Sequence, residues 1–236
     1  MLRVLAGIAA LAAGGAALAD DAAFAELRAA VEMAETHAAD RYAFTLEYRN
    51  LADEEARVFR VRFDPRGAPG ARWTAIDPPE DQYGEKETAA FERMTKNDDA
   101  DDALVYEGLA KGLGGAKLIE ADGARATFAI PISDSDLPKA AKDALAATAT
   151  LDRASGHVET IEIRSLRPFK PAAVAKIKSM RQVQRFGVLT PGGPALLIAA
   201  ESDAEGSAMF KSFSSRTRLS YSEIEKVDAP PRTAGK

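Results

Sequence analysis

The chain has 236 residues, a formal net charge of −5, two histidines and no cysteine. This length is enough for one domain with a sizeable core. Without cysteine the chain can form no disulfide, thiolate metal site or cysteine nucleophile, and two histidines cannot build a three-histidine zinc site. The acidic balance also differs from the basic excess that nucleic-acid-binding proteins usually show, so we expect no nucleic-acid partner.

The N-terminus has the layout of a secretory signal peptide. Arg3 provides a positive charge, residues 4–13 are apolar, and Ala17-Leu18-Ala19 forms a cleavage motif of the A-x-A type. The apolar run is too short and too rich in alanine and glycine for a stable membrane span. We therefore predict a signal peptide over residues 1–19, cleaved after Ala19, and an exported, periplasmic protein that does not span the membrane.

The rest of the chain divides into one domain and a short tail. Residues 20–227 carry apolar patterns throughout, and no second long apolar run appears among them. We expect these residues to form a single α+β domain. Residues 228–236 contain two prolines and are predicted to be a disordered tail.

The first predicted elements are a helix and a β-hairpin. Residues 21–38 have apolar side chains at helical spacing, and Asp20 or Asp21 can cap the first turn. In residues 41–63, apolar and polar side chains alternate in two runs that a short polar link joins. Such alternation gives each strand one apolar face, and the short link favours an antiparallel hairpin. The apolar face consists of Tyr42, Phe44, Leu46, Tyr48, Phe59, Val61 and Phe63.

A short strand, a helix and an acidic cluster come next. The strand is predicted over residues 71–76, which include Trp73, and the helix over residues 85–94. The acidic run at residues 97–102 lacks the glycine and glutamate that a calcium loop needs at its sixth and twelfth positions. We interpret it as a solvated loop whose last aspartates cap a helix over residues 103–113. That helix is predicted to end at Gly112, Gly114 and Gly115.

The second half of the chain is predicted to consist mainly of hairpins. Turn signals at Asp122-Gly123 and Ser155-Gly156 separate strands over residues 117–120, 125–132, 148–152 and 158–166. A short helix is expected over residues 137–146. Residues 174–188 fit a helix or a strand, and we favour a strand because the neighbouring segments are strands. The last strands are predicted over residues 195–201, 207–214 and 216–221, with a turn at residues 203–206.

These patterns together predict an α+β fold. About ten short antiparallel strands each present one apolar face, which has to be removed from water. The economical solution is a curved, half-barrel-like antiparallel sheet that three or four helices cover on one face.

The sequence contains no signature of catalysis or of cofactor binding. The motifs G-x-S-x-G, H-E-x-x-H and S-x-x-K are absent. His157 follows Gly156 at a predicted turn, and we expect it on the surface. We therefore predict a protein without enzymatic activity, without a metal site and without a cofactor.

The order of the elements resembles that of the periplasmic lipoprotein-carrier group, whose members include LolA and LolB. The shared features are the signal peptide, the amphipathic helix, the aromatic strand pair of residues 41–63, the mid-chain helices and the closing run of long hairpins. The resemblance implies a strongly curved antiparallel sheet closed by helices over a hydrophobic cavity that takes acyl chains. The chain differs from LolB in having no cysteine to lipidate, and from LolA in its predicted helices over residues 85–113.

Two functional hypotheses follow, and the sequence leaves both open because a cavity and a packed core require the same apolar pattern. The first is a protein that binds or carries a hydrophobic, lipid-like ligand such as an acyl chain. Its candidate lining residues are Tyr42, Phe44, Leu46, Tyr48, Phe59, Val61, Phe63, Trp73, Phe128 and Ile130. The second is a cell-envelope scaffold with a solid core and a protein partner. Its candidate contact residues are Arg164, Arg167, Lys170, Lys176, Lys178, Arg181 and Arg185.

Overall fold

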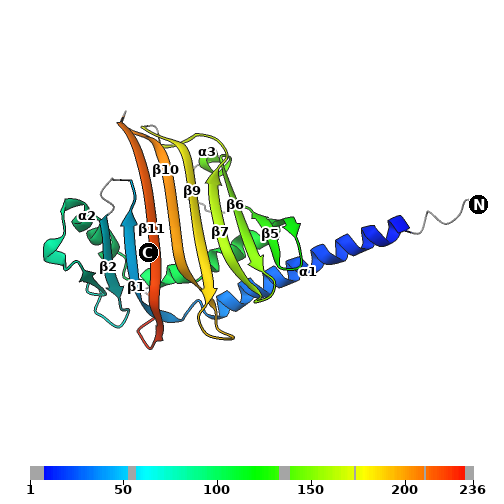
Figure 1. The fold of residues 1–236 in the computed structure, drawn as a ribbon, viewed down its shortest axis with the longest axis horizontal. Coiled ribbons are helices and arrows are strands. Elements are labelled where there is room, and N and C mark those ends of the chain that lie inside the picture. Colours follow the sequence, from blue (N-terminus) through cyan, green and yellow to red (C-terminus); the bar gives the residue numbers. More distant parts are fainter. Residues whose placement is uncertain (1–7, 53–56, 133–138, 173, 210, 232–236) are drawn as a thin grey trace, which may run out of the picture.

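An open antiparallel sheet forms the body of the molecule (Figure 1). The computed structural model describes residues 8–52, 57–132, 139–172, 174–209 and 211–231. The strands within them are β1 (Arg41–Asn50), β2 (Arg57–Phe63), β3 (Trp73–Asp77), β4 (Lys117–Ala121), β5 (Arg125–Ile130), β6 (Leu145–Asp152), β7 (His157–Ser165), β8 (Phe169–Ala172), β9 (Ala175–Val188), β10 (Ala195–Ala208) and β11 (Lys211–Val227). Their order across the sheet is β3-β2-β1-β11-β10-β9-β7-β6-β5-β4, and β8 pairs with β9.

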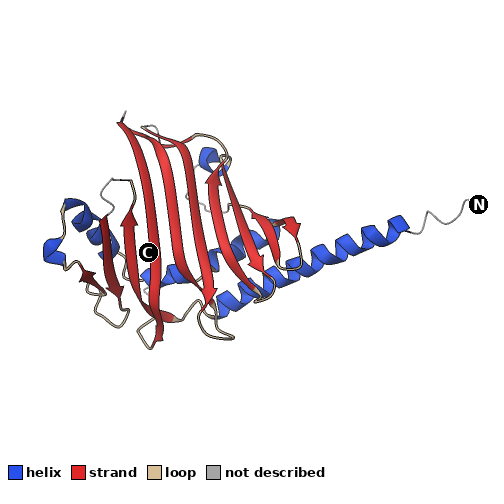
Figure 2. Cartoon of the chain, viewed as in Figure 1, coloured by secondary structure: helices blue, strands red, loops and turns tan. Residues whose placement is uncertain are grey.

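Helical segments cover one face of this sheet. They are α1 (Ile8–Thr36), α2 (Glu85–Thr95) and α3 (Lys139–Lys142), with the 3₁₀ segments η1 (Glu80–Gln82), η2 (Ala100–Leu104) and η3 (Glu107–Gly115). In Figure 2, the C-terminal part of α1 passes behind the sheet, and its N-terminal part extends beyond the edge of the sheet. Its buried residues Leu27 and Val31 belong to the main core. The structure thus confirms the predicted α+β class, an antiparallel sheet covered on one face by helices.

The hairpin predicted over residues 41–63 is confirmed as β1 and β2. Phe44 lies opposite Phe63, and Tyr48 lies opposite Phe59 with ring centroids 4.8 Å apart. β1 also pairs with β11, so the beginning and the end of the domain meet within the sheet. The aromatic side chains of the hairpin belong to the main hydrophobic core or pack against it.

The acidic cluster at residues 97–102 is not the solvated cap that the sequence predicted. Asp101 is fully buried and accepts hydrogen bonds from Arg41 Nε at 2.9 Å and from the Tyr42 backbone N–H at 3.0 Å. Arg41 is also buried, and its guanidinium forms a second ion pair with Asp99 at 3.1 Å. A buried carboxylate is tolerated only when cations and hydrogen bonds compensate for its lost hydration. The cluster therefore ties the beginning of η2 to the start of β1.

The helix predicted over residues 103–113 is replaced by η2 and η3. Val105 separates them, with the extended dihedral angles φ −112° and ψ 140°. Val105 and Tyr106 are both buried, so the break sends two large side chains into the core. The four glycines within η3 also weaken a continuous helix, because each costs about 1 kcal/mol relative to alanine in a helix interior.

The turn predicted at residues 203–206 is wrong. β10 continues through these residues to Ala208, and β11 begins at Lys211. Gly206 lies at a bulge in the pairing with β9, where a Cβ would collide with the Lys176 carbonyl oxygen and approach the Phe213 ring at 2.8 Å. The glycine therefore allows the Phe213 ring and the β9 backbone to approach closely within a long strand, and the chain does not reverse its direction there.

The other predicted elements agree with the structure to different extents. The strand favoured over residues 174–188 is confirmed as β9. The short helix is reduced to α3, because β6 already begins at Leu145, and residues 133–138 lie outside the described part. His157 is half-buried and not on the surface. In the predicted tail, residues 228–231 have no regular structure, but the Pro230 carbonyl accepts a hydrogen bond from Arg41 at 2.6 Å; residues 232–236 lie outside the described part.

Candidate functional site

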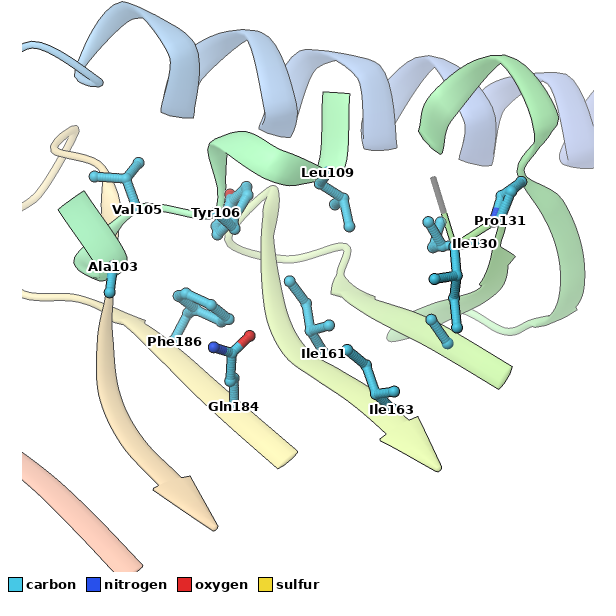
Figure 3. Close-up of a pocket in the computed structure, with 12 residues that line it drawn as sticks. Ala103, Val105, Tyr106, Leu109, Ile130, Pro131, Ile161, Ile163, Gln184 and Phe186 are labelled. Carbon is cyan, nitrogen blue, oxygen red and sulfur yellow. The ribbon is translucent and has the colours of Figure 1, made fainter. Parts of the chain in front are cut away.

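An apolar pocket of about 330 Å³ lies between the sheet and the segment formed by η2 and η3 (Figure 3). The strands β5, β6, β7 and β9 provide its floor, and η2, η3 and the link between them provide its roof. Its lining residues are Ala103, Val105, Tyr106, Leu109, Ile130, Pro131, Ile132, Ala147, Ile161, Ile163, Gln184 and Phe186. None of these described residues carries a charge.

The strand register explains why there is a hollow at this place. Ala147 on β6 lies between Ile130 on β5 and Ile163 on β7, as its direct partner on both sides. Neighbouring side chains in such a row normally fill the surface of the sheet. The single methyl group of Ala147 leaves the space between two isoleucines unfilled. The pocket therefore lies over a small residue between two large ones.

Two glycines bring the roof close to the rim of the sheet. A Cβ at Gly112 would lie 2.6 Å from Ile130 Cγ2, and one at Gly115 would lie 2.7 Å from Pro131 Cγ. Contacting carbon atoms normally lie about 3.5–4.0 Å apart, so larger residues would push η3 away from the end of β5. The glycines that the sequence suggested as a helix stop thus allow the roof to pack closely.

Tyr106 anchors the roof to two other elements. Its hydroxyl donates to the Ala30 carbonyl of α1 at 3.3 Å and accepts from the Val158 backbone N–H at 3.4 Å. Its ring meets that of Phe186 edge to face, with centroids 5.0 Å apart. Burial raises the pKa of the Tyr106 phenol, and the hydrogen bond from Val158 opposes this rise. The hydroxyl is therefore neutral and already engaged within the protein.

Gln184 gives the pocket one polar group. Its side chain lies beside Phe186 and Ile161 in Figure 3, and its backbone is paired with that of Ile161. A neutral amide can donate to a carbonyl or ester oxygen and accept from a hydroxyl group. The arrangement suits a mainly apolar molecule with one polar function, the usual chemistry of small-molecule pockets.

The residues predicted to line a ligand site are mostly elsewhere. Ile130 lines the pocket. The other nine belong to the packed core or lie against it, namely Tyr42, Phe44, Leu46, Tyr48, Phe59, Val61, Phe63, Trp73 and Phe128. Ring contacts join several of them, including Phe44 to Phe63 at 5.2 Å and Phe63 to Trp73 at 5.0 Å. The hollow is centred further along the sheet, under η3. The alternation of Ile161 and Ile163 within the strand predicted over residues 158–166 is the sequence signal that could have pointed there.

The predicted contact residues do not form one uniform basic surface. Arg181 pairs with Glu162 at 2.8 Å, and Arg185 pairs with Glu201 at 2.7 Å, on the exposed face of the sheet. Arg167 donates to the Asp143 carbonyl beside α3. The remaining candidates are exposed on β7, β8 and β9, namely Arg164, Lys170, Lys176 and Lys178. The middle of this segment is electrostatically balanced, and its unpaired cations lie toward one end of the sheet.

Other kinds of site receive no support from the described residues. Across the part of the chain that the structure describes, no three His, Cys, Asp or Glu side chains gather in a way that could hold a metal ion. Its helices, including the 29-residue α1, are not both long and apolar enough to cross a membrane. The sequence matches no protein-family model and shows no significant similarity to a curated protein. The pocket is therefore the feature of the described residues from which a function can be inferred.

Proposed function

We propose that this protein binds a hydrophobic, lipid-like ligand in the pocket beneath η3 and carries it without chemical change. The observation that carries the proposal is an uncharged cavity of about 330 Å³ with a single free polar function. Ligand pockets commonly measure about 300–1,000 Å³ and combine apolar walls with few polar groups. A linear acyl chain with one carbonyl or ester group has the matching chemistry.

The arrangement of the elements supports the same proposal. An open antiparallel sheet with helical segments over one face has its hollow on the covered side, where apolar side chains of the sheet and of η3 would contact a ligand. This is the arrangement that the resemblance to the periplasmic lipoprotein-carrier group implies. The proposal extends that resemblance to function, with the ligand under η3 and not under the first hairpin.

We further propose that the carrier acts in the periplasm, after cleavage behind Ala19. The α1 residues in the main core, Ala23, Leu27, Ala30, Val31 and Ala34, all follow that point, so cleavage would leave them in the domain. N-terminal sequencing of protein recovered from the periplasmic fraction tests this step. The expected first residue is Asp20, and recovery only from the cytoplasm would contradict it.

Native mass spectrometry of the purified protein, followed by lipid extraction, tests ligand binding directly. We expect a bound species of lipid mass, or a shift when a fatty acid or phospholipid is added. A clean unliganded mass with no shift would contradict the proposal and favour the alternative, a cell-envelope scaffold with a solid core.

Two matched substitutions connect binding to the pocket. A147L fills the hollow, whereas A146L places the same side chain on the opposite face of β6, where Ala146 lies beside Arg164. We expect A147L to abolish ligand binding while its free energy of unfolding is maintained or raised, because filling a cavity adds buried apolar contact. A146L should bind as the unmodified protein does. Equal binding by both variants would place the ligand elsewhere.

A further inference from the structure

Two turns meet at the end of the sheet that lies uppermost in Figure 1. One connects β8 with β9 and the other connects β10 with β11. The backbone N–H of Met209 in the second turn donates to the carbonyl of Val174 in the first at 2.9 Å. This bond holds the two turns side by side, and we call Val174, Met209 and the adjoining Phe213 the apolar tip.

The apolar tip is unusually exposed for side chains of this kind. Met209 is 72% exposed, Val174 61% and Phe213 36%. Met209 also has a φ of 48°, in the left-handed region that glycine and asparagine adopt at less cost. A large apolar residue in a strained and exposed position gains nothing from the core of its own domain. Such an outlier points to a contact with something outside the chain.

Lysines surround the apolar tip. They are Lys170, Lys176, Lys178 and Lys211. Each of these side chains is exposed, and none forms an ion pair with another residue in the described part of the chain. Glu205 is the acidic residue of β10 nearest this turn. A protein with a net charge of −5 thus collects unpaired positive charge at one end. Further down the same strands, Arg181 and Arg185 are neutralised by acidic partners.

We propose that this end of the sheet docks onto a lipid bilayer that contains anionic headgroups. The apolar tip would enter the boundary between headgroups and acyl chains, and the four lysines would contact phosphate groups around it. Peripheral binding of this kind requires two signals, a short apolar insertion and basic residues nearby. Long lysine side chains also reach the headgroups while their stems stay against apolar surface.

The composition of this end favours a membrane over a protein partner. Protein–protein interfaces are depleted in lysine and enriched in arginine, tyrosine and tryptophan at their centres. Here the basic residues around the apolar tip are lysines, and the two turns lie at the ends of two hairpins. Docking does not depend on an occupied pocket, so this inference can hold even if the proposed ligand binding fails.

Because the chain has no cysteine, one introduced cysteine can report on the tip. M209C would carry an environment-sensitive nitrobenzoxadiazole fluorophore, and I119C, at a position on β4 that is 56% exposed, is the matched control. With vesicles of phosphatidylglycerol and phosphatidylcholine, we expect a blue shift and an intensity gain at position 209 and no change at position 119. If the probe at position 209 does not respond to vesicles, as expected for a surface that docks onto a protein, the proposal is overturned. An equal response at positions 209 and 119 overturns it as well.

Charge reversal tests the anionic headgroups in the unlabelled full-length chain. We expect K176E/K178E/K211E to lose about a hundredfold in affinity for these vesicles by sedimentation, since each lysine at an anionic surface contributes about fivefold. The control K96E/K111E/K117E changes the net charge equally at exposed positions elsewhere and should bind normally. The N-terminal apolar run is present in every variant, so any contribution it makes to vesicle binding is the same in each and does not affect the difference between them. Equal losses in both triple variants, or equal binding to pure phosphatidylcholine vesicles, would overturn the proposal.

Discussion

Gly112 should be the residue at which the pocket roof is most sensitive to a single added methyl group. In G112A, the new Cβ would lie 2.6 Å from Ile130 Cγ2. Carbon–carbon contacts are normally about 3.5–4.0 Å, so η3 or β5 has to move by about 1 Å. Overpacking of this size costs about 1–3 kcal/mol. In a domain of this length the melting temperature falls by about 2–4 °C for each kcal/mol.

G114A is the matched control, because a Cβ at Gly114 meets no atom within 4 Å. Its backbone φ is outside the left-handed region, so alanine there should be neutral or stabilise the protein by up to about 1 kcal/mol through a less flexible unfolded chain. Thermal unfolding followed by circular dichroism should therefore rank G114A at or above the unmodified protein and G112A below it. A fluorescent fatty acid should also bind more weakly to G112A, whose roof is displaced.

A second substitution identifies the colliding atom. Leucine has no Cγ2 methyl on a branched Cβ, so I130L removes the atom that an alanine at position 112 would meet, at little change in volume. The double variant G112A/I130L should recover most of the lost stability, with a coupling free energy of about 1 kcal/mol or more. If G112A and G114A have the same melting temperature, or if adding I130L to G112A restores no stability, close packing between η3 and β5 does not determine the position of the roof.

Three further predictions concern other parts of the structure. D101N should destabilise the protein by about 1.5–3 kcal/mol in urea unfolding, because the buried Arg41 guanidinium loses one of its two carboxylate partners and keeps Asp99. D77N breaks an exposed pair and should cost at most about 1 kcal/mol. Burial raises the pKa of Tyr221 to about 12. The unfolded chain loses this phenol proton near pH 10, so the free energy of unfolding should fall by about 2–3 kcal/mol between pH 10 and 12. The Y221F variant should lack that part of the decline. Q184L should weaken binding of ester or carboxyl lipids by about three- to tenfold, the value of one hydrogen bond, and an equal effect on a pure alkane would refute a polar role for this amide.

Local patterns in the sequence were sufficient for most of the strands. The alternation in residues 41–63 predicts β1 and β2 because the side-chain period of a strand is visible over a few residues. The same reasoning found β9, despite its helical features, from the strands on either side. Period and turn chemistry are short-range properties, and they predicted the α+β class and the single covered sheet without knowledge of any pairing.

Contacts between distant residues decided what the patterns could not. The aspartates at residues 97–102 look solvated in sequence, and only the pairing of Arg41 with Asp101, 60 residues away, buries one of them. Gly206 looks like a turn, but its role is a close approach to Phe213, which the register of β10 and β11 determines.

The position of the pocket was decided in the same way. An apolar face on a strand predicts burial, but it does not say whether the space above it is filled. The aromatic residues of the first hairpin fill theirs. Above Ala147 a hollow remains, at a point where three strands bring this small residue between Ile130 and Ile163. The sequence by itself determined that one face of the sheet is hidden from water. The tertiary structure decided where on that face there is room for a ligand, since volume depends on which side chains become neighbours.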